Sequence, residues 1–205
     1  ALGQAQRPVS ELGEFFNEVF SHSGTLSELR QLLKFLDDRR RRPTYPLPGL
    51  PFHIHGTYSR DEVSAGLTEL RKGKLLRTQG GVYQCKKHRC DVLFVTLEKD
   101  EKDFTPTTLY NDYPLSQRRF HWESQSTTKL ESTTGLRYRQ PPMWWRILLF
   151  VRKAKKDERK ITMPYLFLGS VRCVSAESER PIQIIWELER PMPPGWFNEV
   201  KIAAG

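Results

Sequence analysis

The chain has 205 residues, which suits one compact domain with a small appendage and is too short for an ATP-driven motor beside a second domain. Apolar residues make up 38% and charged residues 28%, so the composition excludes global disorder. The net charge of +9, together with five Trp, seven Tyr and eleven Phe, favours nucleic acid as a partner, because cations bind phosphate and aromatic rings stack on bases.

Targeting signals and redox usage point to the cytoplasm. The chain starts without Met and shows no charged segment followed by an apolar one, so we expect no signal peptide and a piece of a larger protein. The longest apolar run, 147–151, is far below the roughly 20 residues that cross a bilayer. Three cysteines, an odd count, do not form a disulfide framework. We therefore predict a cytoplasmic protein with no membrane span.

Residues 1–42 have helical spacing and predict a helical hairpin. Apolar residues recur at three- and four-residue steps over Ser10 to Phe20 and again over Ser27 to Asp37, with Gly24 as the turn between them. The apolar faces need a partner. Two remain open: the main domain of this chain, or a neighbouring domain of a longer chain.

A linker is expected over residues 43–52, where four prolines follow four consecutive arginines at 39–42. The arginines either grip phosphate or complement the negative end of the preceding helix. Residues 1–52 carry seven Lys or Arg against six Asp or Glu, while residues 53–205 carry 26 against 18. The positive charge therefore belongs to the domain that we predict over residues 53–205.

That domain opens with a helix and continues as strands. Ser59 and Glu62 have the spacing of a capping box, which predicts a helix over about 59–71. Six later segments are rich in β-branched and aromatic residues and are separated by polar, Pro or Gly stretches. They predict an α+β, mainly β fold with a curved antiparallel sheet or partly closed barrel. The six segments are Gly81–Gln84, Asp91–Glu98, Arg119–Glu123, Arg146–Arg152, Tyr165–Val174 and Ile182–Leu188.

The segment from Phe104 to Tyr138 is the densest candidate site. It mixes Tyr and Trp with Arg and many hydroxyl and amide side chains. On DNA, rings stack bases, arginines pair with phosphate, and a carboxylate accepts from the exocyclic amine of cytosine. The alternative is a strand between polar loops whose aromatic side chains fill the core.

The chain resembles an uncharacterised C-terminal domain family found behind helicase-like ATPase modules in bacterial proteins, including modification-dependent (type IV) restriction enzymes. The likeness spans about 53–197, and the segment 85–90 departs from the family pattern. The shared segments are 58–63 (YSRDEV), 104–113 (FTPTTLYNDY), 120–126 (FHWESQS), 135–138 (GLRY), 149–152 (LFVR) and 190–193 (RPMP).

The resemblance implies a target-recognition module for duplex DNA that carries 5-methylcytosine or 5-hydroxymethylcytosine. A motor and a phospholipase-D-type nuclease would lie on the same parent chain, and the architecture would be similar to the SET- and RING-associated domains that flip a base. Because one methyl group is worth only about 1 kcal/mol, its reading needs an enclosed pocket around a flipped base.

For that implied role we predict two sets of residues, one for the base and one for the backbone. The modified-base pocket would comprise Tyr110, Asp112, Tyr113, Trp122 and Tyr138, with Asp112 as the acceptor for the amine. The backbone contacts would come from Arg118, Arg119, Ser124, Gln125, Ser126, Lys129, Arg137, Lys155 and Lys156.

Other motifs compete with this site. Cys85, His88 and Cys90 are candidate zinc ligands with Cys173 as a fourth, but the spacing is not that of zinc-finger pairs, and we favour a basic turn between two strands. We predict no metal and no cofactor. Of Trp144 and Trp145, one is expected in the core and the other exposed; Trp186 and Trp196 are expected in the core.

Catalytic motifs are missing from the sequence, so we predict a binding module and no intrinsic enzyme. Two rival functions remain: a regulatory domain that docks on its own motor and nuclease and binds DNA without specificity, and a reader of another modification such as a sulfur-substituted backbone.

Overall fold

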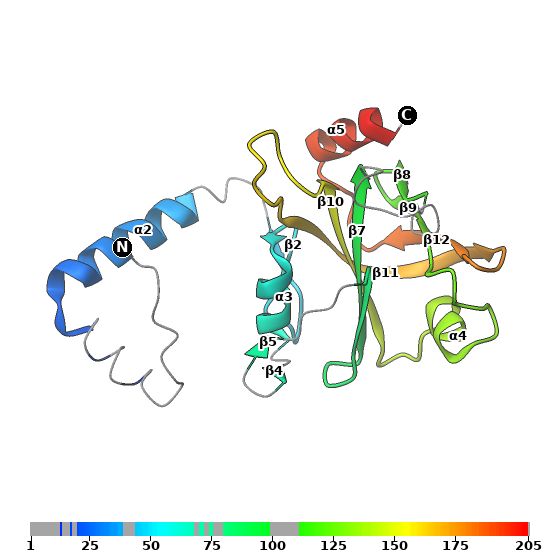
Figure 1. Cartoon of the computed structure of the whole chain (residues 1–205), viewed down its shortest axis with the longest axis horizontal. Helices are drawn as coiled ribbons and strands as arrows, with labels where there is room; N and C mark the ends of the chain where they lie inside the picture. The colour runs from blue at the N-terminus through cyan, green and yellow to red at the C-terminus, as the bar shows by residue number, and fades with distance from the viewer. Residues whose placement is uncertain are drawn as a thin grey trace. The chain divides into compact units, whose positions relative to one another are not determined.

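The computed structural model describes residues 20–38, 44–67, 80–98 and 111–204, with positions 13 and 17 and the backbone of two short strands at 70–71 and 74–75. The chain divides into two units, Ala1–Pro43 and Thr44–Gly205. In the first unit, helix α2 (Ser23–Asp38) confirms the second predicted helix and begins four residues before it (Figure 1). Most of the predicted helix at 10–20 lies outside the described residues. None of the described helices is long and apolar enough to cross a membrane.

The second unit is built on a mixed sheet of eight strands that does not close. Its order is β6-β7-β10-β11-β12-β9-β8, and β3 (Thr57–Tyr58) pairs with β11 outside this path. The α+β, mainly β class is confirmed. One pair, β7 with β10, is parallel instead of antiparallel. A parallel pair needs a long crossover, and here the chain passes through β8, β9 and helix α4 between the two strands.

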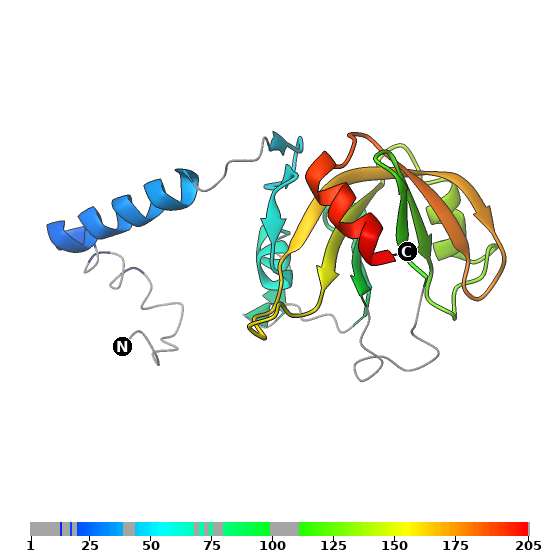
Figure 2. The ribbon, with the colours of Figure 1, turned by 90° about the horizontal axis from the view of Figure 1, so that it is seen from above.

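All six predicted strands are present, with ends that differ by up to three residues. They are β6 (Val82–Cys85), β7 (Cys90–Glu98), β9 (Arg119–Glu123), β10 (Arg146–Ala154), β11 (Tyr165–Glu177) and β12 (Gln183–Leu188). The sequence patterns missed the edge strand β8 (Tyr113–Ser116) and helices α4 (Thr133–Arg139) and α5 (Pro194–Ala204). Helix α5 lies beside β7 and β8 and across one end of the curved sheet (Figure 2).

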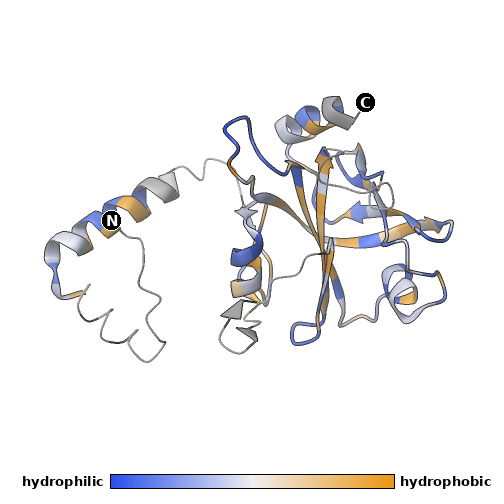
Figure 3. Cartoon of the chain, viewed as in Figure 1, coloured by the Kyte–Doolittle hydropathy of each residue, from blue (hydrophilic) through white to orange (hydrophobic). Residues whose placement is uncertain are grey.

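Strands β7 and β10 are buried on both faces, so the sheet has two apolar cores. Alternate side chains of β7 point to opposite sides: Leu93 belongs to one core and Phe94 to the other. The first core lies inside the curl of the sheet, where Trp186 and Trp196 are buried as predicted. Hydrophobic residues accordingly run along these strands while the connecting loops are hydrophilic (Figure 3).

The second core includes residues that we expected in a linker. Leu47, Leu50 and Phe52 are buried in it, and β1 (Tyr45–Pro46) pairs with β2 (His53–Ile54). The prediction of a linker over 43–52 is therefore wrong for residues 44–52. Its prolines permit an ordered segment because proline fits a short edge strand, and the apolar residues between them supply the buried area.

Helix α3 (Arg60–Gly66) covers the second core and starts where the sequence predicts. Ser59 Oγ accepts from the Glu62 amide at 3.1 Å, and Glu62 Oε2 accepts from the Ser59 amide at 2.7 Å, which completes the capping box. The helix ends at Gly66, not at 71, because the chain turns into the short strands β4 (Leu70–Arg71) and β5 (Lys74–Leu75).

Candidate nucleic-acid interface

Two predicted pocket residues, Trp122 and Tyr138, lie in the first core. Trp122 is 4% exposed and Tyr138 is 2% exposed, and their rings meet edge to face with centroids 5.3 Å apart. Both also contact the ring of Trp186. Burial, with the charge of Asp91, raises the pKa of the Tyr138 hydroxyl. Neither ring face is open to a base, which corrects the role predicted for these two residues.

The other described pocket residues lie on a different side of β9. Asp112 Oδ1 accepts from the Glu123 amide at 3.0 Å, and Tyr113 stacks on His121 with centroids 4.6 Å apart. Trp122 points to the opposite face because neighbouring strand residues alternate. The predicted pocket set therefore does not converge on one cavity. Tyr110 lies outside the described residues.

The predicted backbone contacts are spread over separate places, and two of them have structural roles. Ser124 is buried, and its Oγ accepts from the Ile182 amide at 2.9 Å. Arg137 is held in an ion pair described below. Both assignments to phosphate are therefore corrected. Exposed members remain at the β8–β9 turn (Arg118 and Arg119), before α4 (Gln125, Ser126 and Lys129) and after β10 (Lys155 and Lys156).

A groove of about 460 Å³ lies beside Arg118, but its charges suit phosphate poorly. Its lining includes Glu187 and Glu189, and Arg172 is paired with Glu187. Arg172 lowers the pKa of the Glu187 carboxyl, so this carboxyl stays ionised and repels a polyanion. We therefore look for a nucleic-acid interface elsewhere.

The segment from Cys85 to Cys90 forms the turn that we favoured over a zinc site. The two cysteines are buried, unbridged partners at the ends of β6 and β7. Burial and the neighbouring Cys85 raise the pKa of Cys90 to about 12, so its thiol is protonated at neutral pH, whereas zinc binds thiolate. His88 Nε2 donates to the Leu67 carbonyl at 3.1 Å. Across the part of the chain that the structure describes, no three His, Cys, Asp or Glu side chains group as a metal site.

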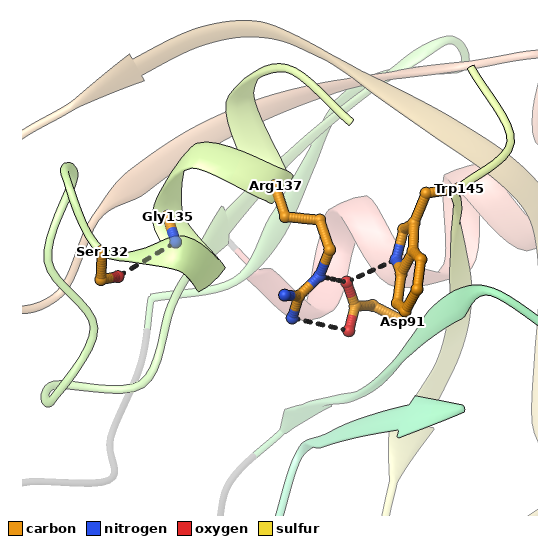
Figure 4. Close-up of polar contacts among 5 residues, drawn as sticks. All are labelled: Asp91, Ser132, Gly135, Arg137 and Trp145. Atoms are coloured by element: carbon orange, nitrogen blue, oxygen red, sulfur yellow. Dashed lines mark hydrogen bonds and ion pairs between the residues drawn. The ribbon is translucent and has the colours of Figure 1, made fainter. Parts of the chain in front are cut away.

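The best-defined polar cluster is centred on Asp91, whose carboxylate is fully buried beside this turn. Arg137 on α4 donates to it twice, from Nε to Oδ2 at 2.5 Å and from Nη2 to Oδ1 at 3.1 Å (Figure 4). Trp145 Nε1 donates to Oδ2 at 2.9 Å, and the Arg137 guanidinium lies 5.2 Å from the centre of the Trp145 ring. One carboxylate therefore ties helix α4 and the segment before β10 to the β6–β7 hairpin.

Helix α4 is short but closely fitted to the preceding loop. Ser132 caps it by accepting from the Gly135 amide at 3.1 Å (Figure 4). A Cβ on Gly135 would lie 2.1 Å from the Lys129 carbonyl oxygen and 2.6 Å from that of Leu130, so only glycine fits. Arg139 donates to Glu131 and to the Leu130 carbonyl. These contacts fix the position of α4, which isolated helices of this length do not achieve.

Apolar side chains lie exposed around this cluster. Trp144 is 65% exposed, Leu136 is 43% exposed, and Met143 is fully exposed. Trp145 is half-buried, so one tryptophan of the pair is exposed, as predicted. The Arg146 amide donates to the Arg89 carbonyl at 3.0 Å, which brings the basic turn to the same end of the sheet. We call this region, made of Lys86, Lys87, Arg89, Leu136, Met143 and Trp144, the α4 surface.

Sequence reasoning left Leu136, Met143 and Trp144 out of the candidate set. The available signals were the tryptophan pair and the proline pair at 141–142, which is typical of a surface turn. Exposure of three apolar side chains at one place depends on tertiary packing, which the local pattern does not report.

No curated protein sequence matches the chain. A family model described as "Domain of unknown function (DUF3427)" matches residues 52–200, well over half of the chain and most of the second unit. The chain therefore belongs to the DUF3427 family of domains of unknown function.

Proposed function

We propose that this domain binds duplex DNA through the α4 surface and serves as the target-recognition module of an ATP-dependent, modification-dependent restriction enzyme in the cytoplasm. A motor and a nuclease would lie on the same parent chain. The observation that carries the proposal is an exposed tryptophan, Trp144, beside a basic turn and braced by a buried ion pair.

Charge at the α4 surface favours a polyanion. Arg137 is neutralised by Asp91, so the cations available to phosphate are the exposed Lys86, Lys87 and Arg89. No Asp or Glu occurs from 86 to 90 or from 132 to 146. Each phosphate neutralised releases bound counterions, which makes such binding strongly dependent on salt.

The position of Trp144 suits base stacking. Its neighbour Trp145 is fixed by the hydrogen bond to Asp91, and the Trp145 amide also donates to the Pro142 carbonyl at 2.8 Å. The Trp144 ring is thus presented from a braced turn, which lowers the entropy cost of binding. Stacking of a base on an aromatic ring contributes about 1–3 kcal/mol.

Reading of a modified cytosine is the finer part of the proposal. A methyl group at C5 changes apolar contact and shape and leaves the hydrogen-bonding groups unchanged, so its recognition needs apolar neighbours around the base. Leu136 and Met143 are exposed beside Trp144 and are suitable neighbours. The resemblance of the segments quoted above to domains of type IV restriction enzymes supports 5-methylcytosine or 5-hydroxymethylcytosine as the target.

A competition binding assay with the whole chain tests this function. A labelled duplex is displaced at fixed salt by unlabelled duplexes of one sequence that contain cytosine, 5-methylcytosine or 5-hydroxymethylcytosine. We expect a modified duplex to compete best. Equal competition by all three would overturn modified-base reading, and absence of binding to any duplex would overturn the DNA-binding function itself.

A second candidate, a domain that docks on the motor and nuclease of its own chain, is favoured by the same exposed apolar side chains, because such patches mark protein interfaces. Salt dependence separates the two functions. Binding to DNA backbone alone falls steeply with salt and ignores the modification, whereas docking through apolar contact changes little with salt.

A further inference from the structure

The hairpin that joins β10 to β11 extends beyond the sheet and is exposed along its whole length. Every residue from 155 to 162 is exposed. The hairpin is nevertheless ordered: Lys156 and Thr162 form an antiparallel bridge, and the Met163 amide donates to the Lys155 carbonyl at 3.1 Å. We call residues 155–162 the arm. It is mostly hydrophilic and lies at the end of β10 (Figure 3).

The tip of the arm has one defined turn. The Asp157 amide donates to the Ile161 carbonyl at 2.9 Å, and Asp157 Oδ1 accepts from the amides of Arg159 at 3.0 Å and Ile161 at 2.8 Å. Lys160 adopts a left-handed conformation with φ of 62°. The Asp157 carboxylate is thus used to close the turn, as Asp does in tight turns.

The base of the arm is fixed to the sheet. Arg152 Nε donates to Thr96 Oγ1 at 2.9 Å, Arg152 Nη1 donates to the Met163 carbonyl at 3.3 Å, and the guanidinium lies 4.4 Å from the centre of the Tyr165 ring. Lys153 Nζ lies 3.7 Å from carboxylate oxygens of both Glu98 and Glu199. The arm therefore projects from a rigid support.

The side chains of the arm combine positive charge with one exposed apolar residue. It carries Lys155, Lys156, Arg159 and Lys160 against Asp157 and Glu158. Ile161, next to the turn, is 61% exposed and belongs to neither core. A β-branched apolar side chain at this place adds nothing to folding that a polar residue would not, so its use lies outside the folded chain.

We propose that the arm enters a DNA groove and that Ile161 inserts between neighbouring base pairs as a wedge. The inference rests on the proposed DNA binding. Apolar wedges that unstack a base step, flanked by cations that bind the adjacent phosphates, kink the duplex and offset the cost of unstacking by the added contact. A narrow hairpin with one apolar residue and four cations fits this role.

The placement of the arm agrees with a single duplex that contacts both ends of β10. The α4 surface adjoins Arg146 at the start of β10, and the arm follows Ala154 at its end. Nine strand residues span about 30 Å, close to the 34–36 Å of one turn of B-DNA. Contacts one helical turn apart fall on the same side of a duplex.

Fluorescence of 2-aminopurine placed along a duplex tests the wedge, because this base brightens when it is unstacked. With saturating whole chain we expect brightening at one step, and we expect Ile161→Ala to abolish it and to weaken binding by about tenfold through lost apolar contact. Val174→Ala, which shortens another exposed β-branched residue on β11, is the matched control and should behave as wild type. Thermal unfolding of both variants checks that they fold.

The outcomes separate the two proposals. If the wild-type chain binds no duplex, the proposed function fails. If it binds but no position brightens, or if Ile161→Ala brightens as much as wild type, the wedge is wrong while DNA binding stands. Binding of the arm to vesicles of anionic lipid, lost in Ile161→Ala with no effect on DNA, would also overturn the wedge.

Discussion

At the scale of residues, the account depends most on Asp91, a buried carboxylate with two donors from two different segments. Burial of a charge is costly unless it is paired and hydrogen-bonded, so neither partner is tolerated alone. The pair holds α4 and Trp145 in place, and the exposed Trp144 depends on it. Asp91 is therefore a positioning residue of the α4 surface.

We predict that Asp91→Asn and Arg137→Met each lower the free energy of unfolding by about 3 kcal/mol, because each leaves the other member of a buried pair without its counter-charge. The double variant should cost much less than the two single costs added together. Urea unfolding of the four proteins measures this coupling. Costs that simply add would contradict the role of the pair.

Cys90 gives a prediction on pH. Its pKa is raised from about 9 to about 12 in the folded chain by burial and by Cys85, so between these values the unfolded chain releases a proton that the folded chain keeps. The resulting stability is complete below pH 9 and is lost as the pH rises towards 12, with a slope of up to about 1.4 kcal/mol per pH unit. Unfolding free energies measured from pH 8 to 10.5 should fall less steeply in Cys90→Ala than in wild type. Equal slopes would show that this thiol does not titrate as stated.

At the scale of elements, the strands were predictable and the small helices were not. The strands are short runs of β-branched and aromatic residues with polar or Pro/Gly breaks, and this signal is local. Helix α4 has only seven residues, and α5 begins at a Pro-Pro-Gly stretch that is more typical of a turn, although proline suits the first turn of a helix. Both depend on contacts with the sheet that the sequence does not reveal.

The candidate site was predictable only in part, and the reason is burial. Trp122 and Tyr138 have the composition of a base-binding site, but an edge-to-face pair under Trp186 is core packing. An aromatic residue in a strand gives the same sequence signal in either role. Which face of β9 it occupies is decided by pairing with β12, a partner more than sixty residues away in sequence.

Helix α4 gives a prediction with an internal control. Gly135→Ala places a methyl group against two backbone carbonyl oxygens, so the helix has to move, and we expect a loss of about 2–3 kcal/mol in unfolding free energy. Gly195→Ala in α5 meets no atom within 4 Å and should be neutral or stabilising by up to about 1 kcal/mol. Denaturant unfolding compares them. Equal effects would mean that α4 is not held closely to its loop.

At the scale of the whole molecule, charge and exposed apolar surface occur together at the two ends of β10. The second unit carries nearly all of the net positive charge, and its exposed apolar side chains include Trp144 at one end and Ile161 at the other. Neither was in the pocket predicted from the sequence. The basic frame for the backbone thus remains the expectation, while the aromatic contact moves from the core residue Trp122 to the surface residue Trp144.

The affinity of Trp144→Ala for duplex DNA tests the central claim most directly. Fluorescence anisotropy of a labelled duplex compares the variant with wild type and with Leu115→Ala, which removes a similarly exposed apolar side chain on β8. We predict a tenfold or greater loss of affinity for Trp144→Ala, as about 1–3 kcal/mol of stacking requires, and wild-type affinity for Leu115→Ala. Binding of a correctly folded Trp144→Ala protein with wild-type affinity would contradict the account.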